Sequence, residues 1–267
     1  MSLTAFIVPS RYPVVVTILS CLFIAIKIKL LHVAEPASLV GLKLLPMGII
    51  YTLADKLGSI ASNPLSKRYA GCIQVGLALS ALGDLCLELE SHLESDRAKL
   101  CFLGGLGSFL LAHLAYVYAL FTNADSISWP AIFLSYSYAG CFVFFLWDGI
   151  SATFMKGAVA FYATALASML CAAICRGGTS RATRASVVNG VIGALLFTVS
   201  DSVLGFDRFK VSGDRVKLVE ITIMSTYYAA QYFLALSING TNAMSQTQQD
   251  TRNSPREKPA VQKCKVK

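Results

Sequence analysis

Charged residues are scarce in this chain. Only 14% of its 267 residues are Asp, Glu, Lys or Arg, whereas 55% are hydrophobic, and the mean hydropathy is +0.60. A soluble domain usually has roughly a quarter of its residues charged, so the shortage argues against a soluble globular protein. The net charge of +8 falls in loops and in a basic tail. It indicates membrane topology and contact with anionic lipid head groups, and we expect no nucleic-acid partner.

The short motifs of several hydrolase classes are also missing. The chain has no Gly-x-Ser-x-Gly elbow, no His-Glu-x-x-His and no Gly-x-x-x-x-Gly-Lys loop. These absences disfavour serine-hydrolase, zinc-protease and P-loop chemistry. Eight cysteines are scattered along the sequence without the spacing of a zinc site, so we expect them to be free thiols. We expect neither a metal nor a cofactor.

Apolar runs of about twenty residues recur along the chain, and a helix of that length crosses a bilayer. They predict an all-α polytopic membrane protein in which residues 1–240 form a bundle of eight transmembrane helices. The first run lacks a small-residue cleavage site, so we expect it to be a retained span. The predicted spans are 13–31, 37–54, 70–89, 101–121, 128–147, 156–175, 185–206 and 216–237.

Lys and Arg residues are more frequent on the side of the predicted bundle that holds both termini. This bias predicts that both termini are cytosolic. The residues on that side are Arg11, Lys56, Lys67, Arg68, Arg176, Arg181, Arg184 and those of the tail. Residues 241–267 are polar and basic, and they predict a disordered cytosolic tail.

The last five residues are Lys263-Cys264-Lys265-Val266-Lys267. Lysines at the third and fifth positions from the end resemble the dilysine retrieval signal of endoplasmic reticulum membrane proteins. This pattern favours an integral membrane protein of the endoplasmic reticulum. A basic tail that contacts lipid head groups is an equal alternative.

Two aspartates, Asp84 and Asp201, interrupt otherwise apolar spans at matched depth. A carboxylate inside a membrane span costs several kcal/mol when unpaired, so it indicates a functional site. Two of them at one depth predict a shared site with one carboxyl as acid and the other as base. Lys43 falls in the same layer, roughly 7–10 Å inside the far surface. The alternatives are carboxylates that only hold helices together and a lysine that extends to the interface.

Other polar side chains in the spans are individually common helix-packing groups. Their shared depth with the aspartates nevertheless predicts that they contact the substrate. With Lys43, these residues are His113, Tyr116, Asn189, Ser200, Tyr227, Tyr228 and Gln231. A separate acidic run that includes Glu88 and Glu90 predicts a solvated loop on the far side of the membrane.

Several of these residues lie in short motifs that, taken in order, resemble the lysoplasmalogenase family of YhhN-like membrane hydrolases. The resemblance covers about residues 38–237. The motifs are Lys43-Leu44-Leu45-Pro46, Gly83-Asp84, Ala112-His113-Leu114-Ala115-Tyr116, Ser200-Asp201 followed by Phe206-Asp207-Arg208-Phe209, and Ile223-Met224-Ser225-Thr226-Tyr227-Tyr228-Ala229-Ala230-Gln231.

The resemblance implies an eight-helix hydrolase that cleaves the vinyl ether bond of lysoplasmalogens, which are alkenyl lysophospholipids. Its products would be a fatty aldehyde and glycerophosphocholine or glycerophosphoethanolamine. The family's acidic pair corresponds to Asp84 and Asp201. Protonation of the vinyl carbon by one carboxyl and stabilisation of the resulting cation by the other follows the two-carboxylate logic of glycoside hydrolysis.

The residues alone leave two other functions open. A proton-coupled membrane transporter would also carry intramembrane acids, and the segment Gly76–Asp84 is weakly echoed by Gly193–Asp201, as in transporters with internal repeats. A lipid-binding adaptor would tolerate Asn at both aspartates. The sequence gives no indication of the oligomeric state.

Overall fold

A computed structural model describes residues 11–30, 36–211 and 217–241. The described residues form eight α-helices and two short 3-10 turns, and they contain no strand. The helices are α1 (Arg11–Leu30), α2 (Pro36–Ser59), α3 (Pro64–Glu90), α4 (Ser95–Thr122), α5 (Trp129–Leu146), α6 (Thr153–Cys175), α7 (Arg184–Lys210) and α8 (Lys217–Leu236).

Each predicted span coincides with one of these helices, and the differences lie at the helix ends. The largest are at α3, which begins at Pro64 rather than at residue 70, and at α4, which begins at Ser95 rather than at residue 101. Asn63 caps α3, because its side-chain oxygen accepts a hydrogen bond from the Ser66 backbone N–H at 2.7 Å. Proline in the first turn has no N–H that would be left unpaired. Capping chemistry therefore extends α3 by more than a turn beyond its apolar run.

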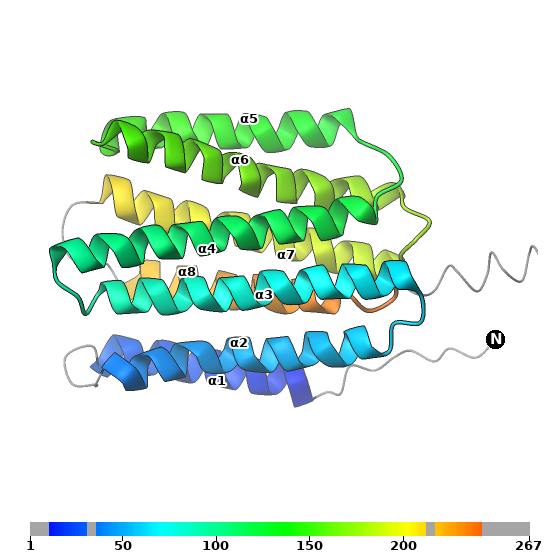
Figure 1. Cartoon of the computed structure of the whole chain (residues 1–267), viewed down its shortest axis with the longest axis horizontal. Coiled ribbons are helices and arrows are strands. Elements are labelled where there is room, and N and C mark those ends of the chain that lie inside the picture. Colours follow the sequence, from blue (N-terminus) through cyan, green and yellow to red (C-terminus); the bar gives the residue numbers. More distant parts are fainter. Residues whose placement is uncertain (1–10, 31–35, 212–216, 242–267) are drawn as a thin grey trace, which may run out of the picture.

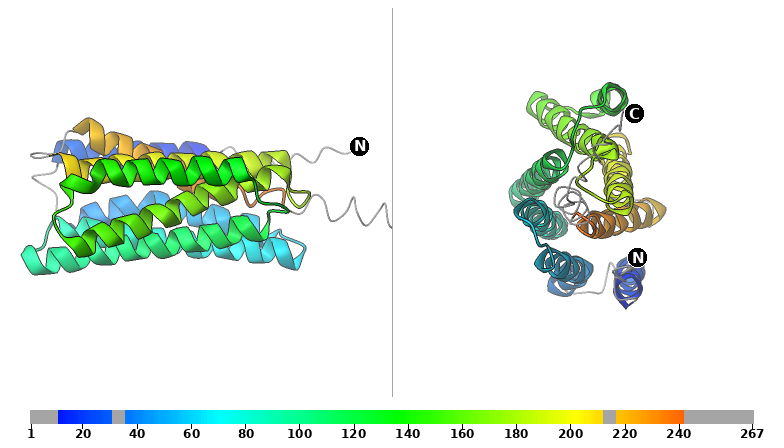
Figure 2. Two further views of the ribbon diagram at one scale, coloured as in Figure 1. Left: turned by 90° about the horizontal axis from the view of Figure 1, so that it is seen from above. Right: turned by 90° about the vertical axis from the view of Figure 1, so that its right-hand side faces the viewer.

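Six of the helices form a closed ring. Around it, α2 packs on α3, α3 on α4, α4 on α6, α6 on α7, α7 on α8, and α8 again on α2. Helix α1 packs outside the ring against α2 and α8, and α5 packs outside it against α6 and α7. Figures 1 and 2 show the helices running side by side, with α1 and α5 on opposite flanks of the bundle.

The helices fit a membrane environment. Within the described residues, α3, α4, α5, α6 and α7 are long and apolar enough to cross a bilayer. The outer helix α5 exposes large aromatic side chains, including Trp129, Phe133 and Phe144. Such a face would be unfavourable in water but suits contact with lipid. The chain is therefore an integral membrane protein.

The predicted tail and its dilysine pattern lie outside the described residues from residue 242 onward. Thr241, the last described residue, is buried. Its carbonyl oxygen accepts a hydrogen bond from the Ser66 hydroxyl at 3.0 Å. This bond attaches the segment after α8 to the first turn of α3.

Arg176, at the end of α6, is completely buried at the end of the bundle opposite to Asp84 and Asp201. Its guanidinium donates to the Tyr69 hydroxyl at 2.9 Å and to the Ser186 hydroxyl at 3.0 Å, and it stacks on the Tyr69 ring. It thereby connects α6 with α3 and α7. As predicted, this arginine lies in the connection after the sixth span, between α6 and α7, but its charge is buried inside the bundle instead of facing solvent.

Close contact between α7 and α8 depends on Gly193. A Cβ atom there would lie 3.0 Å from the Ala230 carbonyl oxygen and 2.8 Å from the Leu234 side chain. We therefore expect Gly193→Ala to force the two helices apart and to cost about 1–3 kcal/mol. Gly140 of α5 is the matched control, since a Cβ there meets nothing within 4 Å.

The measurement is thermal unfolding of both variants in detergent. Gly193→Ala should lower Tm, whereas Gly140→Ala should leave it unchanged or raise it, because alanine favours the helix. Equal Tm values for the two variants would contradict this account of the α7–α8 contact.

Candidate active site

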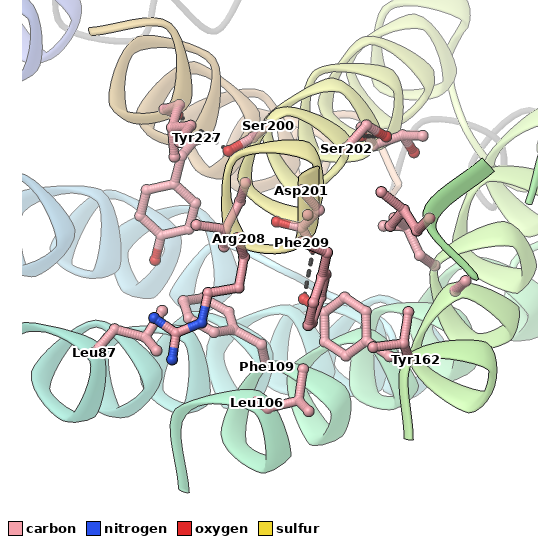
Figure 3. A pocket seen from close by; sticks show the side chains of 18 of the residues that line it. Leu87, Leu106, Phe109, Tyr162, Ser200, Asp201, Ser202, Arg208, Phe209 and Tyr227 are labelled. Atoms are coloured by element: carbon pink, nitrogen blue, oxygen red, sulfur yellow. Dashed lines mark hydrogen bonds between the residues drawn. The ribbon is translucent and has the colours of Figure 1, made fainter. Parts of the chain in front are cut away.

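A cavity of about 600 Å³ opens at the end of the bundle where α3 and α7 end and α8 begins. Its lining comes from seven helices, α2 to α8. Most of the wall is apolar and includes Leu106, Phe109, Leu166 and Leu170. The cavity can therefore accommodate an apolar chain, while its polar groups are confined to a few positions. Figure 3 shows part of this lining, with residues from α3, α4, α6, α7 and α8 pointing toward a common space.

Asp84 belongs to a buried charged group. The Lys43 ammonium lies 3.6 Å from Asp84 Oδ1 and 3.4 Å from Glu88 Oε2. The Tyr227 hydroxyl donates to Asp84 Oδ2 at 2.5 Å. The three charged residues are each 5% exposed or less. One lysine thus faces two carboxylates inside the bundle.

Helix geometry explains why these groups meet. Asp84 and Glu88 are four residues apart on α3, so they lie one above the other on one face. Helix α2 packs against α3 and brings Lys43 to that face. The Tyr228 hydroxyl donates to the Lys43 carbonyl oxygen at 2.9 Å, which fixes α8 against α2 at the same level.

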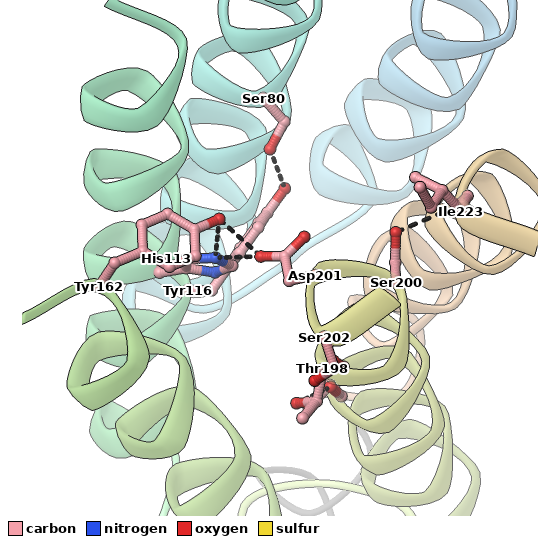
Figure 4. Close-up of polar contacts among 10 residues, drawn as sticks. Ser80, His113, Tyr116, Tyr162, Thr198, Ser200, Asp201, Ser202 and Ile223 are labelled. Atoms are coloured by element: carbon pink, nitrogen blue, oxygen red, sulfur yellow. Dashed lines mark hydrogen bonds and ion pairs between the residues drawn. The ribbon is translucent and has the colours of Figure 1, made fainter. Parts of the chain in front are cut away.

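Asp201 belongs to a different group. The Tyr162 hydroxyl donates to Asp201 Oδ2 at 2.5 Å, and His113 Nε2 lies 3.2 Å from the same oxygen. His113 Nε2 is also 3.0 Å from the Tyr162 hydroxyl oxygen. Figure 4 shows this triangle, which is formed by side chains from α4, α6 and α7.

His113 is completely buried, and its Nδ1 has no hydrogen-bond partner. A buried N–H without a hydrogen-bond acceptor costs more free energy than a buried acceptor without a donor. We therefore place a ring proton on Nε2, the nitrogen that faces Asp201. Asp201 then accepts hydrogen bonds from both Tyr162 and His113.

Aromatic side chains lie between the two groups. The Phe197 ring packs edge-on against both His113 and Tyr227, at centroid distances of 4.7 and 5.6 Å. Phe109 packs against Phe197 and Tyr227. Asp84 and Asp201 therefore line the same cavity, but each has its own hydrogen-bond partners.

The other predicted residues are distributed around this cavity. Lys43, Ser200 and Tyr227 line it together with the two aspartates. Ser200 donates to the Ile223 carbonyl oxygen at 3.0 Å and so connects α7 with α8. Behind the wall, the Tyr116 hydroxyl donates to Gln231 Oε1 at 2.6 Å.

Asn189 is not part of the cavity lining. It precedes Asp201 by twelve residues on α7, which places it about 18 Å away along the helix axis.

Two residues of the site were not identified from the sequence. Glu88 was assigned to a solvated loop, but α3 continues to Glu90 and Glu88 is 2% exposed. The prediction was wrong because the acidic run extends from the buried face of the helix into solvent. The four-residue spacing of Glu88 from Asp84 could have indicated that both side chains lie on one face of the helix. Tyr162 carried no signal, since many tyrosines occur in these spans. Among the described residues, no three His, Cys, Asp or Glu side chains are grouped as metal ligands.

The chain is similar to several known proteins. A model of the YhhN family matches residues 38–238. Lysoplasmalogenase TMEM86B of Sus scrofa is 31% identical over 173 residues, and that of Homo sapiens is 33% identical over 170 residues. Lysoplasmalogenase TMEM86A of Bos taurus is 30% identical over 192 residues.

These alignments cover 64%, 63% and 70% of this chain, respectively. They cover 65% of the pig protein, 64% of the human protein and 72% of the bovine protein. The chain thus spans somewhat less than two thirds of the length of the two TMEM86B relatives. No solved structure is significantly similar to it.

Proposed function

Because the chain belongs to the YhhN family, we propose that it is a membrane lysoplasmalogenase. Its substrates would be alkenyl lysophospholipids with a choline or ethanolamine head group. Hydrolysis of the vinyl ether bond would release a fatty aldehyde and glycerophosphocholine or glycerophosphoethanolamine. The names of the relatives support this activity, and the site suits its chemistry.

The observation that carries the proposal is a largely apolar cavity with two carboxyls on opposite helices, the buried Asp84 and the partly buried Asp201. Asp84 and Asp201 both line it, and each is oriented by a tyrosine hydroxyl. Vinyl ether hydrolysis needs an acid that delivers a proton to carbon and a base that activates water. The apolar remainder of the cavity provides room for the alkenyl chain.

Burial suggests which carboxyl is the acid. Asp84 is 3% exposed and lies in a largely apolar cavity. Such surroundings disfavour an ionised carboxyl, so Asp84 would hold a proton. Asp84 lies one helical turn deeper than Glu88 and would deliver this proton to the β-carbon of the vinyl ether. The resulting cation is an oxocarbenium ion on the adjacent carbon and the ether oxygen.

Asp201 would act as the base. Its two hydrogen-bond donors, Tyr162 and His113, would stabilise a carboxylate that can accept a proton. This carboxylate stabilises the oxocarbenium ion and then removes a proton from the attacking water. The hemiacetal so formed breaks its carbon–oxygen bond, and the aldehyde and the free glycerol hydroxyl leave. No step requires more than water and the transferred protons.

The test is aldehyde release from an alkenyl lysophosphocholine by the purified protein in detergent micelles. A saturated alkyl ether of the same chain length is the matched control, because it has no double bond to protonate. A hydrolase should release aldehyde from the first lipid only. A proton-coupled carrier would release none in micelles, so well-folded protein without aldehyde release would refute the proposal.

The Tyr162 hydroxyl gives a second prediction. We expect Tyr162→Phe to lower kcat about 10-fold to 100-fold, because it removes a charge-assisted hydrogen bond from the base. Tyr136→Phe on α5 is the matched control, since its hydroxyl bonds Ser168 and lies outside the cavity lining. The measurement is kcat and KM for aldehyde release. Equal rates for the two variants would exclude Tyr162 from the mechanism.

We also propose that all eight helices cross the bilayer and that the first residue of α1 and the end of α8 face the cytosol. The closed ring includes α2 and α8, and α1 packs against both. The end of the bundle that carries Lys67, Arg68, Arg181 and Arg184 would then be cytosolic. The cavity would open on the opposite side, which is the lumen if the protein resides in the endoplasmic reticulum.

A further inference from the structure

The open end of the cavity carries an ion pair that the catalytic proposal does not use. Arg208 of α7 and Glu90 of α3 both line the cavity, and the Arg208 guanidinium donates to Glu90 Oε1 at 2.5 Å. Figure 3 shows the Arg208 side chain extending from α7 toward α3, where Leu87 lies. Its guanidinium also stacks on the Phe102 ring, 4.2 Å from the centroid. The cation is therefore oriented across the mouth of the cavity.

Arg208 and Glu90 can give up their contact with each other and bind a ligand instead. The Arg208 side chain is 39% exposed and that of Glu90 is 18% exposed. An ion pair with this much access to solvent contributes little stability, so separating its members costs little. The same two residues also line a second hollow of about 420 Å³. Both charged groups can therefore be reached by a bound molecule.

Of the cations that line the cavity within the described residues, Lys43 is unsuited to bind a ligand's phosphate. It is 5% exposed and lies between two carboxylates. The Arg208 guanidinium, in contrast, offers a planar pair of donors that matches two phosphate oxygens. A phosphate in this cavity would therefore bind at Arg208.

The spacing along α7 fits a lysophospholipid. Arg208 follows Asp201 by seven residues, which places it two turns away on the same helix face, about 10 Å toward the mouth. In an alkenyl lysophospholipid, six covalent bonds separate the vinyl carbon that water attacks from the phosphorus, about 7 Å when extended. With the vinyl ether at Asp201, the phosphate would reach the arginine side chain.

Acidic side chains of the same cavity distinguish between head groups. Glu90 pairs with Arg208, and Glu220 also lines the cavity. A phosphate alone would leave Glu90 without its cation once Arg208 had turned to the ligand. A head group with an ammonium restores that partner. The mouth therefore matches a zwitterion, with a phosphodiester on the arginine and an ammonium on the carboxylate.

We propose that Arg208 and Glu90 form a head-group site that selects zwitterionic phospho-ammonium lysolipids over neutral and purely anionic ones. This inference rests on the proposed function, since it takes the reacting bond to lie at Asp201. Arg208 would bind the phosphodiester and Glu90 the ammonium. Neither residue has a part in the proton transfers.

The test measures binding, so that it does not depend on hydrolysis. Saturated 1-O-alkyl glycerophosphocholine, 1-O-alkyl glycerol 3-phosphate and 1-O-alkyl glycerol of one chain length are titrated into the protein in an uncharged detergent. Wild type should bind the phosphocholine lipid about 10-fold more tightly than the neutral one, as expected for charge-assisted hydrogen bonds. Arg208→Gln should abolish this difference without changing the Kd of the neutral lipid.

Glu90→Gln should weaken binding of the phosphocholine lipid and tighten binding of the glycerol 3-phosphate lipid. Lys210→Gln is the matched control for the arginine, since Lys210 lies two residues further on α7, stacks on Phe145 and is outside the cavity lining. It should keep the wild-type preference. Equal weakening of all three lipids in Arg208→Gln would indicate a merely structural role and overturn the proposal, as would a wild type without any preference.

Aldehyde release by the same preparations separates this inference from the proposed function. If the head-group preference depends on Arg208 but wild type releases no aldehyde, the site stands and the hydrolase proposal fails. If wild type releases aldehyde but Arg208→Gln binds the three lipids as wild type does, the hydrolase proposal stands and the head-group site fails.

Discussion

Asp84→Asn and Asp201→Asn should each lower kcat for aldehyde release by about 10²–10⁴-fold, the range that a positioned acid or base contributes. Asn keeps the size of the side chain and an oxygen that can accept the tyrosine hydrogen bond, but it neither delivers nor removes a proton. The fold should survive in both variants. At Asp84 the remaining Glu88 balances the charge of Lys43, and at Asp201 the amide oxygen still accepts from Tyr162.

The control is Asp148→Asn. This residue is exposed in the short turn after α5 and lies outside the cavity lining. It should keep the wild-type rate. Thermal unfolding of all three variants shows whether a loss of rate reflects chemistry or unfolding. Activity close to wild type in both cavity variants would exclude the two-carboxylate mechanism.

Truncated variants distinguish the acid from the base. Formate is a small carboxylate that can occupy the space left by Asp201→Ala and can activate water there. It should therefore restore part of the aldehyde release in that variant. It should not rescue Asp84→Ala, where a proton donor held against Lys43 and Tyr227 is missing. Rescue of Asp84→Ala alone would reverse the assignment of the two roles.

The sequence predicted the eight helices because apolar length and helix breakers are local properties of the chain. Depth along a span is also local, since each residue adds a fixed rise. Counting residues from the span ends was therefore sufficient to place Lys43 and Asp84 in one layer, and the structure brings them within 3.6 Å. The same count placed Asp201 at that level.

The neighbours of each helix were not predictable in the same way. Tyr162 meets Asp201 because α6 packs between α4 and α7 in the ring, and no local pattern encodes that order. The position of the aromatic side chains between Asp84 and Asp201 could not be predicted from the sequence for a related reason. Phe109 and Phe197 look like ordinary apolar residues of a span, and only the packing of α4, α7 and α8 shows that they lie between the two polar groups.

Glu88 is a buried residue that lies within a hydrophilic run of the sequence. The residues from Glu88 to Asp96 look uniformly solvated, but helix periodicity points Glu88 inward with Asp84 and leaves Glu94 and Asp96 exposed. The partner of Glu88, Lys43, lies on a different helix and could not be identified from the acidic run itself.

Lys43→Met should destabilise the protein strongly, because it removes the cation that the buried Asp84 and Glu88 carboxyls both face. Removing one partner of a buried ion pair typically costs about 3–5 kcal/mol, which corresponds to a fall in Tm of about 10 °C for a chain of this size. Methionine fills most of the volume of the lysine stem, so the effect would reflect charge rather than a cavity. Lys56→Met, at the exposed far end of α2, is the control and should leave Tm nearly unchanged.

The double variant Lys43→Met/Glu88→Gln tests the cause of that loss. If uncompensated charge destabilises the single variant, removing the second carboxylate should recover much of the lost Tm, even though two native side chains are then missing. Asp84 would be the remaining acid, and a neutral carboxylic acid that accepts the Tyr227 hydrogen bond is tolerable inside the bundle. A double variant no more stable than Lys43→Met would show that the lysine contributes by packing.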